Sequence, residues 1–475
     1  MTSIQRRASR SGVAAFLFAA LLLGCPAERS EDTPEEPAAL KPARILLFAV
    51  DGLEWSVVLP MLERGELPTF AALMERGVFG TLRTFEPALS PIIWTTVATG
   101  KLPSRHGITG FVYDVPGPNG PQRRLFSSGD RKTKAFWNML SDAGLSVDVV
   151  GWWITYPAEP VRGLMVSQTN TSAALGDDTS RLIKGSLQPD VEGLVWPREK
   201  AAEVLATLRE MDAELPAILR EAYGERPHPL GELEQRLWDE SLWSFRADET
   251  YLRIALDRLR EPPARVTALY MGAPDVVGHR FWRYAFPEQF DDRPPREQVE
   301  NFGDLLAATY RRADRALAAL LERMPADVTV WVMSDHGMQA RNTGKRFSAA
   351  NARRQRSSGA HVPRALLIAA GPGIRRAGVP AEEIASLELG DLPELGSVLD
   401  TTPTFLTLLG LAVGKDMDGR PVTEVIQPAW LAENPVRSIP SWDTGDWATA
   451  REAFRVQQPG DEERLEQLRS LGYIE

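Results

Sequence analysis

Three of the five histidines in this 475-residue chain lie close to an apolar run and near an aspartate or a glycine. His279 lies four residues after Asp275, a spacing that places both side chains on one face of a helix. His336 directly follows Asp335 at the end of an apolar run, and His361 lies just before another such run. Imidazole and carboxylate groups are common ligands of zinc and related divalent cations. These five residues are therefore candidate metal ligands.

Asp51 and Ser90 are two further candidates. Asp51 follows the apolar run of residues 44–50, which is typical of a strand buried on both faces. The carboxyl end of such a strand is where open α/β sheets bind ligands. Ser90 precedes Pro91 and an apolar, threonine-rich segment that stops at Gly100, a pattern that predicts a helix with Ser90 as its N-cap. A hydroxyl there lies at the positive end of a helix, where anions bind.

Taken one at a time, these residues have ordinary structural explanations. A serine caps helices, an aspartate occupies turns, and a buried histidine forms hydrogen bonds in a core. Taken together, they supply six nitrogen and oxygen ligands and one hydroxyl, enough for two ions with open coordination positions. A hydroxyl beside two cations is suited to phosphoryl transfer, because cations neutralise the phosphoryl oxygens and activate the nucleophile.

The segments that must position these residues alternate between strand and helix patterns. Continuous apolar runs predict strands at residues 44–50, 147–152, 265–270, 328–333 and 365–370. Segments bounded by Pro or Gly, or with a 3.6-residue period, predict helices at residues 68–76, 134–143, 301–324 and 400–409. This alternation predicts an α/β fold with a doubly wound, mostly parallel sheet flanked by helices. Residues 168–244 lack strand patterns and predict a helical insertion, or cap, with helices at 199–222 and 230–242.

Charge and cysteine content exclude several classes of function. The net charge of −10 argues against binding to a nucleic-acid duplex, although a local metal site still permits a small phosphorylated ligand. The single cysteine excludes a disulfide framework and a cysteine-based metal site.

The N-terminus carries a targeting pattern. Three arginines precede the short apolar stretch of residues 12–23, and the only cysteine, Cys25, follows Gly24. This arrangement resembles a bacterial lipoprotein signal peptide at residues 1–24, which implies lipid attachment at Cys25 and a place in the cell envelope; a plain secretory signal is the alternative. Residues 25–42, rich in Pro, Glu and Ala, predict a disordered tether between membrane and domain.

The order of the motifs resembles the alkaline phosphatase superfamily, and within it the type I phosphodiesterase/nucleotide pyrophosphatase branch. The matching positions run from Asp51 and Ser90 through the Thr99-Gly100 pair and His106-Gly107 to the Asp275/His279, Asp335-His336-Gly337 and Gly359/His361 blocks. The resemblance covers about residues 44–425 and leaves 168–244 unmatched. It implies a catalytic domain at 43–428, followed by a tail at 429–475 that ends in a helix at 461–471.

The resemblance also implies roles for individual residues. Asp51, Ser90, Asp335 and His336 match the ligands of one divalent ion; Asp275, His279 and His361 match those of a second. Family metals are usually zinc, and manganese in some branches. Ser90 matches the nucleophile, so the implied reaction is hydrolysis of a phosphate ester, of a small molecule or linked to a lipid or glycan, through a phosphoseryl intermediate. His106 matches a family position without a metal role, which predicts a structural residue.

Two departures from the family pattern leave the reaction class open. The branch has an asparagine three residues after its nucleophile, where this chain has Ile93, and no arginine adjoins Ser90 to bind phosphoryl oxygens. Phosphonate hydrolysis and phospho-group transfer on the same core are therefore alternatives. A sulfatase is a further alternative, but the segment from Ser90 to Trp94 lacks the arginine of the sulfatase motif and has its proline one place early. A surface lipoprotein without catalytic activity is the alternative from another class.

Overall fold

The computed structural model describes residues 43–117, 120–168, 192–344, 357–445 and 447–452. The predicted signal peptide, the tether and the helix expected at 461–471 lie outside the described residues. Within the described part, no helix combines the length and the hydrophobicity needed to cross a bilayer.

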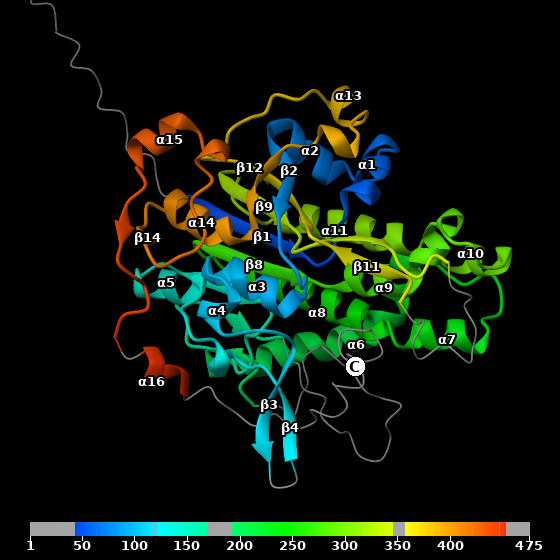
Figure 1. Cartoon of the computed structure of the whole chain (residues 1–475), viewed down its shortest axis with the longest axis horizontal. Helices are drawn as coiled ribbons and strands as arrows, with labels where there is room; N and C mark the ends of the chain where they lie inside the picture. Colours follow the sequence, from blue (N-terminus) through cyan, green and yellow to red (C-terminus); the bar gives the residue numbers. More distant parts are fainter. Residues whose placement is uncertain (1–42, 118–119, 169–191, 345–356, 446, 453–475) are drawn as a thin grey trace, which may run out of the picture. The chain divides into compact units, whose positions relative to one another are not determined.

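A nine-stranded sheet forms the centre of the fold, as the sequence predicts (Figure 1). Its strand order is β13-β2-β12-β9-β1-β8-β5-β6-β7, and only β12 and β7 run antiparallel to their neighbours. The strands are β1 (Arg44–Val50), β2 (Gly77–Arg83), β5 (Val147–Val150), β6 (Met165–Val166), β7 (Val195–Trp196), β8 (Val266–Met271), β9 (Val328–Met333), β12 (Arg364–Ala370) and β13 (Glu394–Ser397). The prediction of an α/β fold with a mostly parallel sheet is confirmed.

The sheet is covered on both faces, which explains why its central strands read as unbroken apolar runs. In β1, Leu46, Phe48 and Val50 pack into one core, and Ile45, Leu47 and Ala49 pack into the other. The first core is closed by α1 (Trp55–Glu63), α2 (Pro68–Arg76), α8 (Leu242–Arg258), α9 (Ala273–Ala285), α10 (Arg296–Phe302) and α11 (Leu305–Leu321). The second is closed by α3 (Ser90–Thr99), α5 (Phe136–Asp142), α14 (Thr401–Leu408) and α15 (Pro428–Glu433).

The helix predicted at residues 301–324 is wrong in its extent, because two helices occupy the region. α10 ends at Phe302, and α11 starts at Leu305. A Cβ at Gly303 would lie 2.7 Å from the carbonyl oxygen of Val299 and 3.2 Å from that of Tyr284. A side chain at position 303 would therefore be crowded against the backbone of α10 and α9, although Gly303 itself has helical dihedral angles.

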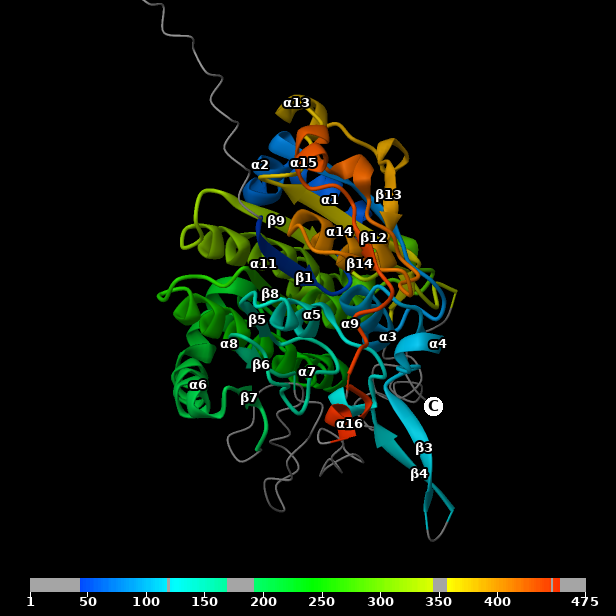
Figure 2. The same cartoon turned by 90° about the vertical axis from the view of Figure 1, so that its left-hand side faces the viewer.

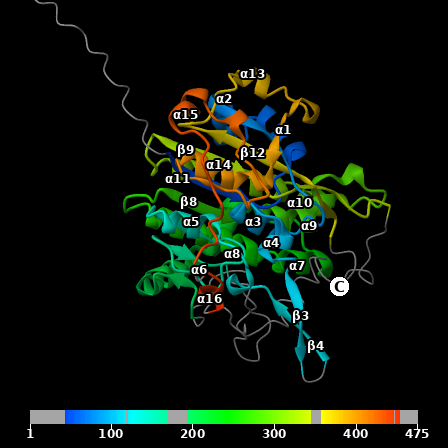
Figure 3. The ribbon, with the colours of Figure 1, turned by 60° about the vertical axis from the view of Figure 1, so that its left-hand side comes forward.

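The insertion contains two charged helices, α6 (Ala201–Tyr223) and α7 (Glu232–Asp239), close to their predicted bounds. α6 packs beside α8, as Figures 2 and 3 show, and it also contacts α11, so it adds a further helix outside the first face of the sheet. The pair β6 and β7 closes one edge of the sheet; β7 lies inside the segment expected to contain only helices.

Three small sheets complete the described structure. β3 (Val112–Gly117) and β4 (Gly120–Leu125) form a hairpin that projects away from the helices, labelled at the bottom of Figures 1 to 3. β10 (Gly337–Ala340) pairs antiparallel with β11 (Gly359–Val362), and β14 (Val413–Gly414) pairs with β15 (Ser438–Ile439). The remaining short helices are α4 (Pro103–His106), α13 (Ala381–Ile384) and α16 (Trp447–Glu452).

The tail beyond residue 428 is tied to the main domain. Nζ of Lys101, which follows the C-cap of α3, lies 2.5 Å from Asp416 and 2.7 Å from Asp443. The side chain of Lys101 is almost fully buried, so this pairing holds the tail against the end of α3.

Candidate active site

The ligand candidates meet at the carboxyl ends of three neighbouring strands. β1 lies between β8 and β9 and runs parallel to both, with Val50 beside Met271 and Ala49 beside Met333. Asp51 follows β1, Asp335 follows β9, and α9 begins directly after β8. Because the strand ends are in register, side chains far apart in sequence come together at one edge of the sheet.

The first ligand group joins Asp51, Asp335 and His336. Nε2 of His336 lies 3.3 Å from Oδ1 of Asp51 and 3.3 Å from Oδ2 of Asp335. All three side chains are fully buried. Their donor atoms are close enough to one another to bind a single ion.

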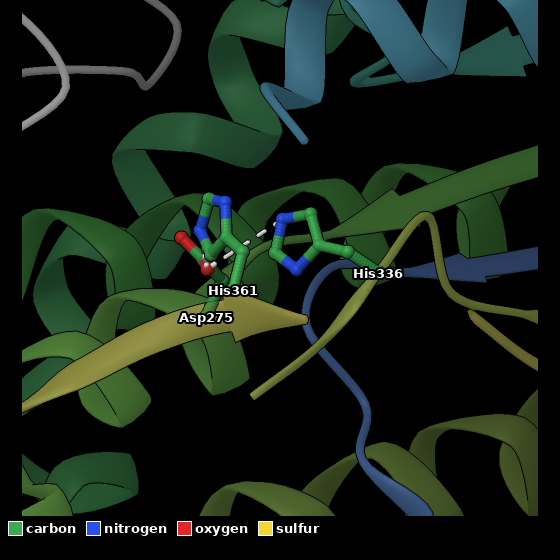
Figure 4. A group of neighbouring side chains, drawn as sticks. All are labelled: Asp275, His336 and His361. Carbon is green, nitrogen blue, oxygen red and sulfur yellow. Dashed lines mark hydrogen bonds and ion pairs between the residues drawn. The ribbon is translucent and has the colours of Figure 1, made fainter. Parts of the chain in front are cut away.

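The second ligand group surrounds Asp275 on the first turn of α9. Its Oδ1 lies 3.2 Å from Nε2 of His361, 3.4 Å from Nε2 of His279 and 3.9 Å from Nε2 of His336. Figure 4 shows the rings of His336 and His361 side by side next to the Asp275 carboxylate, with His361 on β11 and His336 on the loop after β9. His336 thus lies between the two groups.

The hydrogen bonds of the three histidines fix which ring nitrogen faces the site. Nδ1 of His279 bonds the carbonyl of Gly359, Nδ1 of His336 that of Gly337, and Nδ1 of His361 that of Ala88. A ring nitrogen that bonds a carbonyl must carry the hydrogen, so in the neutral rings the Nε2 lone pairs face inward. This is the tautomer and the outer hydrogen bond found in metal-bound histidines.

The arrangement fits a bound cation, because otherwise acceptor atoms face one another. Nε2 of His336 and Oδ2 of Asp335 are buried without a hydrogen-bond partner among the described residues. Nε2 of His279 and Nε2 of His361 both face the site and lie 2.7 Å apart, closer than two ligands of one tetrahedral ion, so a bound ion would move these two rings slightly apart. Donors bound tetrahedrally at about 2.0–2.1 Å lie about 3.3 Å from one another, which matches the spacing in the first group.

Burial shapes the charge of these groups in the ion-free chain. Burial, with the nearby charge of Asp275, raises the pKa of Asp51 to about 7; burial, with the charges of Asp51 and Asp275, raises the pKa of Asp335 well above its usual value. Burial also lowers the pKa of His336 well below the ordinary range. For Asp275, burial acts to raise the pKa, but His279 and His361 outweigh it and the net shift is downward. Crowded carboxylates of this kind are stabilised as anions by a cation.

Ser90 borders the first ligand group but is not the helix cap that its sequence predicts. Leu89 is the N-cap of α3, and Ser90 and Pro91 are the first two helical residues. The amides of Ile92 and Ile93 bond the carbonyl of Leu89, so these first-turn donors are already used. The hydroxyl of Ser90 instead donates to Oδ1 of Asp51 at 3.4 Å, the oxygen that also faces His336. The predicted end of the helix is correct, because Gly100 forms a left-handed C-cap.

Two donors that the sequence analysis did not single out hold Asp51. Its Oδ2 accepts hydrogen bonds from Tyr270 Oη at 2.7 Å and from Trp94 Nε1 at 3.0 Å. Oδ1 therefore remains the oxygen for Ser90 and a metal ion. A signal was available for Trp94, which stands four residues after Ser90 and so on the same face of the helix. Tyr270 lies one residue before the end of β8, inside an apolar run that gave no sign of a polar role.

The other sequence candidates are placed as follows. His106 is buried away from the ligand groups: Nε2 lies 3.0 Å from Oγ1 of Thr96, and Nδ1 accepts the amide of Ile108 at 3.1 Å. Ile93 is fully buried in the apolar core and offers no polar atom to a ligand. Cys25 lies outside the described residues.

The fold and the clustered carboxylates and imidazoles define an α/β protein with a candidate metal centre at the carboxyl edge of its sheet. Residues 45–373 match the family model of the type I phosphodiesterase/nucleotide pyrophosphatases. Since the match spans more than half of the chain, the protein belongs to this family, which is metal-dependent, and it is a phosphoric ester hydrolase. No curated protein matches the sequence.

The solved structures that match this chain share little sequence with it. Phosphonoacetate hydrolase from Sinorhizobium meliloti 1021, in complex with phosphonoformate, is 18% identical with a TM-score of 0.38; the match covers 63% of this chain and 57% of that one. Murine ectonucleotide pyrophosphatase/phosphodiesterase 5, in complex with AMP, is 12% identical with a TM-score of 0.44, over 81% of this chain and 100% of that one. The alkaline phosphatase PafA is 12% identical with a TM-score of 0.49, over 82% and 100%.

Proposed function

We propose that the chain hydrolyses a phosphate ester with Ser90 as nucleophile and two divalent ions, zinc or manganese, as cofactors. One observation carries the proposal: three inward-facing Nε2 atoms and three buried carboxylates converge beside a single serine hydroxyl. Asp51, Asp335, His336 and Ser90 would hold one ion. Asp275, His279 and His361 would hold the other. The nitrogen and oxygen donors suit zinc and also accept manganese.

When bound, the two ions would neutralise the phosphoryl oxygens, favour the ionised Ser90 hydroxyl and stabilise the leaving oxygen. Asp51 positions the hydroxyl through its Oδ1 while Trp94 and Tyr270 hold its Oδ2. Ser90 Oγ forms a bond to phosphorus, the bond from phosphorus to the ester oxygen breaks, and the leaving group departs with a proton. Water then attacks phosphorus, which releases phosphate or a monoester and restores the Ser90 hydroxyl.

The surroundings of Ser90 are compatible with a phosphate monoester, a phosphate diester or a phosphonate as substrate. Ile93 supplies no hydrogen bond where the family pattern has an asparagine, and the amides of Ile92 and Ile93 are engaged. The substrate is a small phosphorylated molecule, or a phosphate group linked to a lipid or glycan. Phospho-group transfer to an acceptor other than water would use the same phosphoseryl intermediate.

A parallel assay tests this function. Metal-stripped protein is supplied with zinc or manganese and offered aryl phosphate monoester, aryl phosphate diester, aryl phosphonate and aryl sulfate under matched conditions. We expect hydrolysis of at least one phosphorus ester, restored by metal and absent from stripped protein. Turnover of the sulfate alone would replace the proposal with a sulfatase. Metal binding without turnover of any substrate would support a lipoprotein without catalytic activity.

We further propose that the protein is exported and lipid-anchored in a bacterial envelope through Cys25. The support is the sequence pattern of residues 1–25. Labelling with a radioactive fatty acid should mark the wild-type protein but not the Cys25→Ala variant. Equal labelling of both would contradict the anchor.

A further inference from the structure

Glu54 is a buried carboxylate three residues after Asp51 that the proposed reaction does not use. It is the N-cap of α1, and its Oε1 accepts the amide of Ser56 at 3.0 Å. Only about 1% of the residue is exposed. A cap alone does not require burial of a charge, since caps work equally well at the surface.

The remaining contacts of Glu54 reach two other ligand-bearing segments. Its Oε2 accepts a hydrogen bond from the amide of Met338 at 3.2 Å, and its Oε1 accepts one from Nη2 of Arg364 at 2.8 Å. Met338 lies two residues after His336, and Arg364 lies three residues after His361. Met338 is also paired with His361 across the β10–β11 ladder. One carboxylate therefore touches the segments that carry Asp51, His336 and His361.

The packing at Gly337 shows how closely Glu54 approaches the loop that carries His336. A Cβ at position 337 would lie 2.0 Å from Oε2 of Glu54. No side chain fits in that space, which gives a physical reason for the glycine in the Asp335-His336-Gly337 run.

The backbone around Glu54 is fixed by further hydrogen bonds. The hydroxyl of Tyr310 accepts the Glu54 amide at 2.9 Å and donates to the carbonyl of Gly52 at 3.2 Å. The hydroxyl of Ser334 donates to the carbonyl of Leu53 at 3.1 Å and accepts the amide of Leu366 at 2.8 Å. The Glu54 carboxylate thus projects from a rigid turn, so its position constrains the loops that it contacts.

We propose that Glu54 and Arg364 form a positioning pair that holds the loops carrying Asp51, His336 and His361 at the spacing a metal ion requires. The inference rests on the proposed metal-dependent function, and it assigns the pair to metal affinity instead of bond cleavage. The physical reason is that ligand atoms held close to their bound geometry before the ion arrives need little further ordering, whereas ordering them on binding lowers the affinity for the ion. Neither residue touches the reacting atoms.

The test compares Glu54→Gln with a matched control elsewhere in the fold. Asp314 is also buried and also anchors a helix start, since its carboxylate accepts the amides of Phe70 at 2.8 Å and Thr69 at 3.2 Å. Zinc affinity of the purified, stripped full-length chain is measured by competition with a chromophoric chelator, and Tm is measured on the same metal-free samples. We expect Glu54→Gln to bind zinc about 10- to 100-fold more weakly, the range for residues that orient metal ligands. Asp314→Asn should lower Tm but leave zinc affinity within about threefold of wild type, less than a tenfold step in binding.

Arg364 provides a second, partly exposed position that is less prone to folding failure. Arg364→Met should also weaken zinc binding, and Arg364→Lys should bind zinc more tightly than Arg364→Met. Because the two residues act as a pair, the Glu54→Gln/Arg364→Met double variant should lose less zinc affinity than the sum of the two single losses. The proposed role of the pair would be overturned if Glu54→Gln and Arg364→Met both bound zinc within about threefold of wild type, which is less than a tenfold step. Failure of the proposed function is distinguishable: wild-type protein that binds zinc without cleaving esters leaves the affinity comparison intact, whereas wild-type protein that binds no zinc overturns both.

Discussion

Two buried histidines, His106 and His336, show what separates a structural imidazole from a ligand. Both are fully enclosed, and burial lowers the pKa of each. In His106 both ring nitrogens have partners, Thr96 and the amide of Ile108. In His336, Nδ1 has a hydrogen-bond partner, but Nε2 has none within the described part of the chain and faces two carboxylates at 3.3 Å. The hydrogen-bond partners, and not the burial, distinguish the two roles.

Replacing each histidine by alanine gives the largest contrast. We expect His336→Ala to lose about a thousandfold or more in ester hydrolysis, because a group that acts as part of a catalytic unit disables the whole unit. Its metal content, measured by elemental analysis, should fall below that of wild type. His106→Ala should lower Tm and keep its metal content and its activity per folded molecule. Similar activity losses in the two variants would contradict the distinction.

Ser90→Ala separates the nucleophile from the ligands. The variant should lose about a thousandfold or more in turnover, since the hydroxyl that forms the covalent bond is gone. All six Asp and His ligands are kept in this variant, so both ions should remain in elemental analysis. Wild-type turnover by this variant would exclude Ser90 as the nucleophile.

Tyr270→Phe removes one hydrogen bond to Asp51, and so tests how much the partners of a ligand matter. Removing the hydroxyl leaves Oδ2 of Asp51 with its hydrogen bond from Trp94, which should reduce turnover by about tenfold, the equivalent of one lost hydrogen bond. Tyr251→Phe is the control, because Tyr251 is similarly buried but packs against Gly151. Equal kinetics for Tyr270→Phe and wild type would show that Asp51 needs no such support.

The pH dependence of stability tests the comparison at His106 without reference to activity. Burial, followed by the nearby charge of Arg131, lowers the pKa of His106 to about 3 in the folded chain, whereas an unfolded histidine titrates near 6.5. The folded state therefore has its full stability from this residue above pH about 6.5, and loses it as the pH falls from there toward 3, by at most about 1.4 kcal/mol per pH unit.

The measurement compares wild type with His106→Asn by denaturant unfolding between pH 7 and pH 5. Asparagine retains an acceptor for the Ile108 amide but does not titrate. Chelator is present throughout, so that loss of metal does not contribute. The difference in unfolding free energy between wild type and variant should shrink as the pH falls; a constant difference would mean that His106 is not held neutral.

Much of the architecture was predictable because it depends on local patterns. The runs at residues 44–50 and 328–333 have the composition of strands buried on both faces, and they form β1 and β9 with the predicted bounds. The helix at residues 68–76 is bounded by Pro68 and Gly77, and it is α2 with the predicted bounds. The long helix at 301–324 was predicted wrongly, because the segment is divided between Phe302 and Leu305 and its apolar period does not mark that break.

The candidate ligands could be named from the sequence, but their roles and the residues around them could not. Trp94, Tyr270 and Glu54 gave little or no signal, since an aromatic residue in an apolar run or a glutamate before a helix reads as packing or capping. Ser90 was placed as a cap, because a serine before a proline has that local preference; in the folded chain Asp51 lies within reach of its hydroxyl and Leu89 precedes the helix.

The sequence by itself determined which residue types stand at the ends of which strands, because hydrophobic runs and glycine and proline signals act over a few residues. Only the tertiary structure decided which of those ends meet. The order β9-β1-β8 brings residues 51, 275 and 335 together, and the β10–β11 ladder delivers His361 to the same place. Strand order depends on contacts between segments hundreds of residues apart, and no local pattern records them.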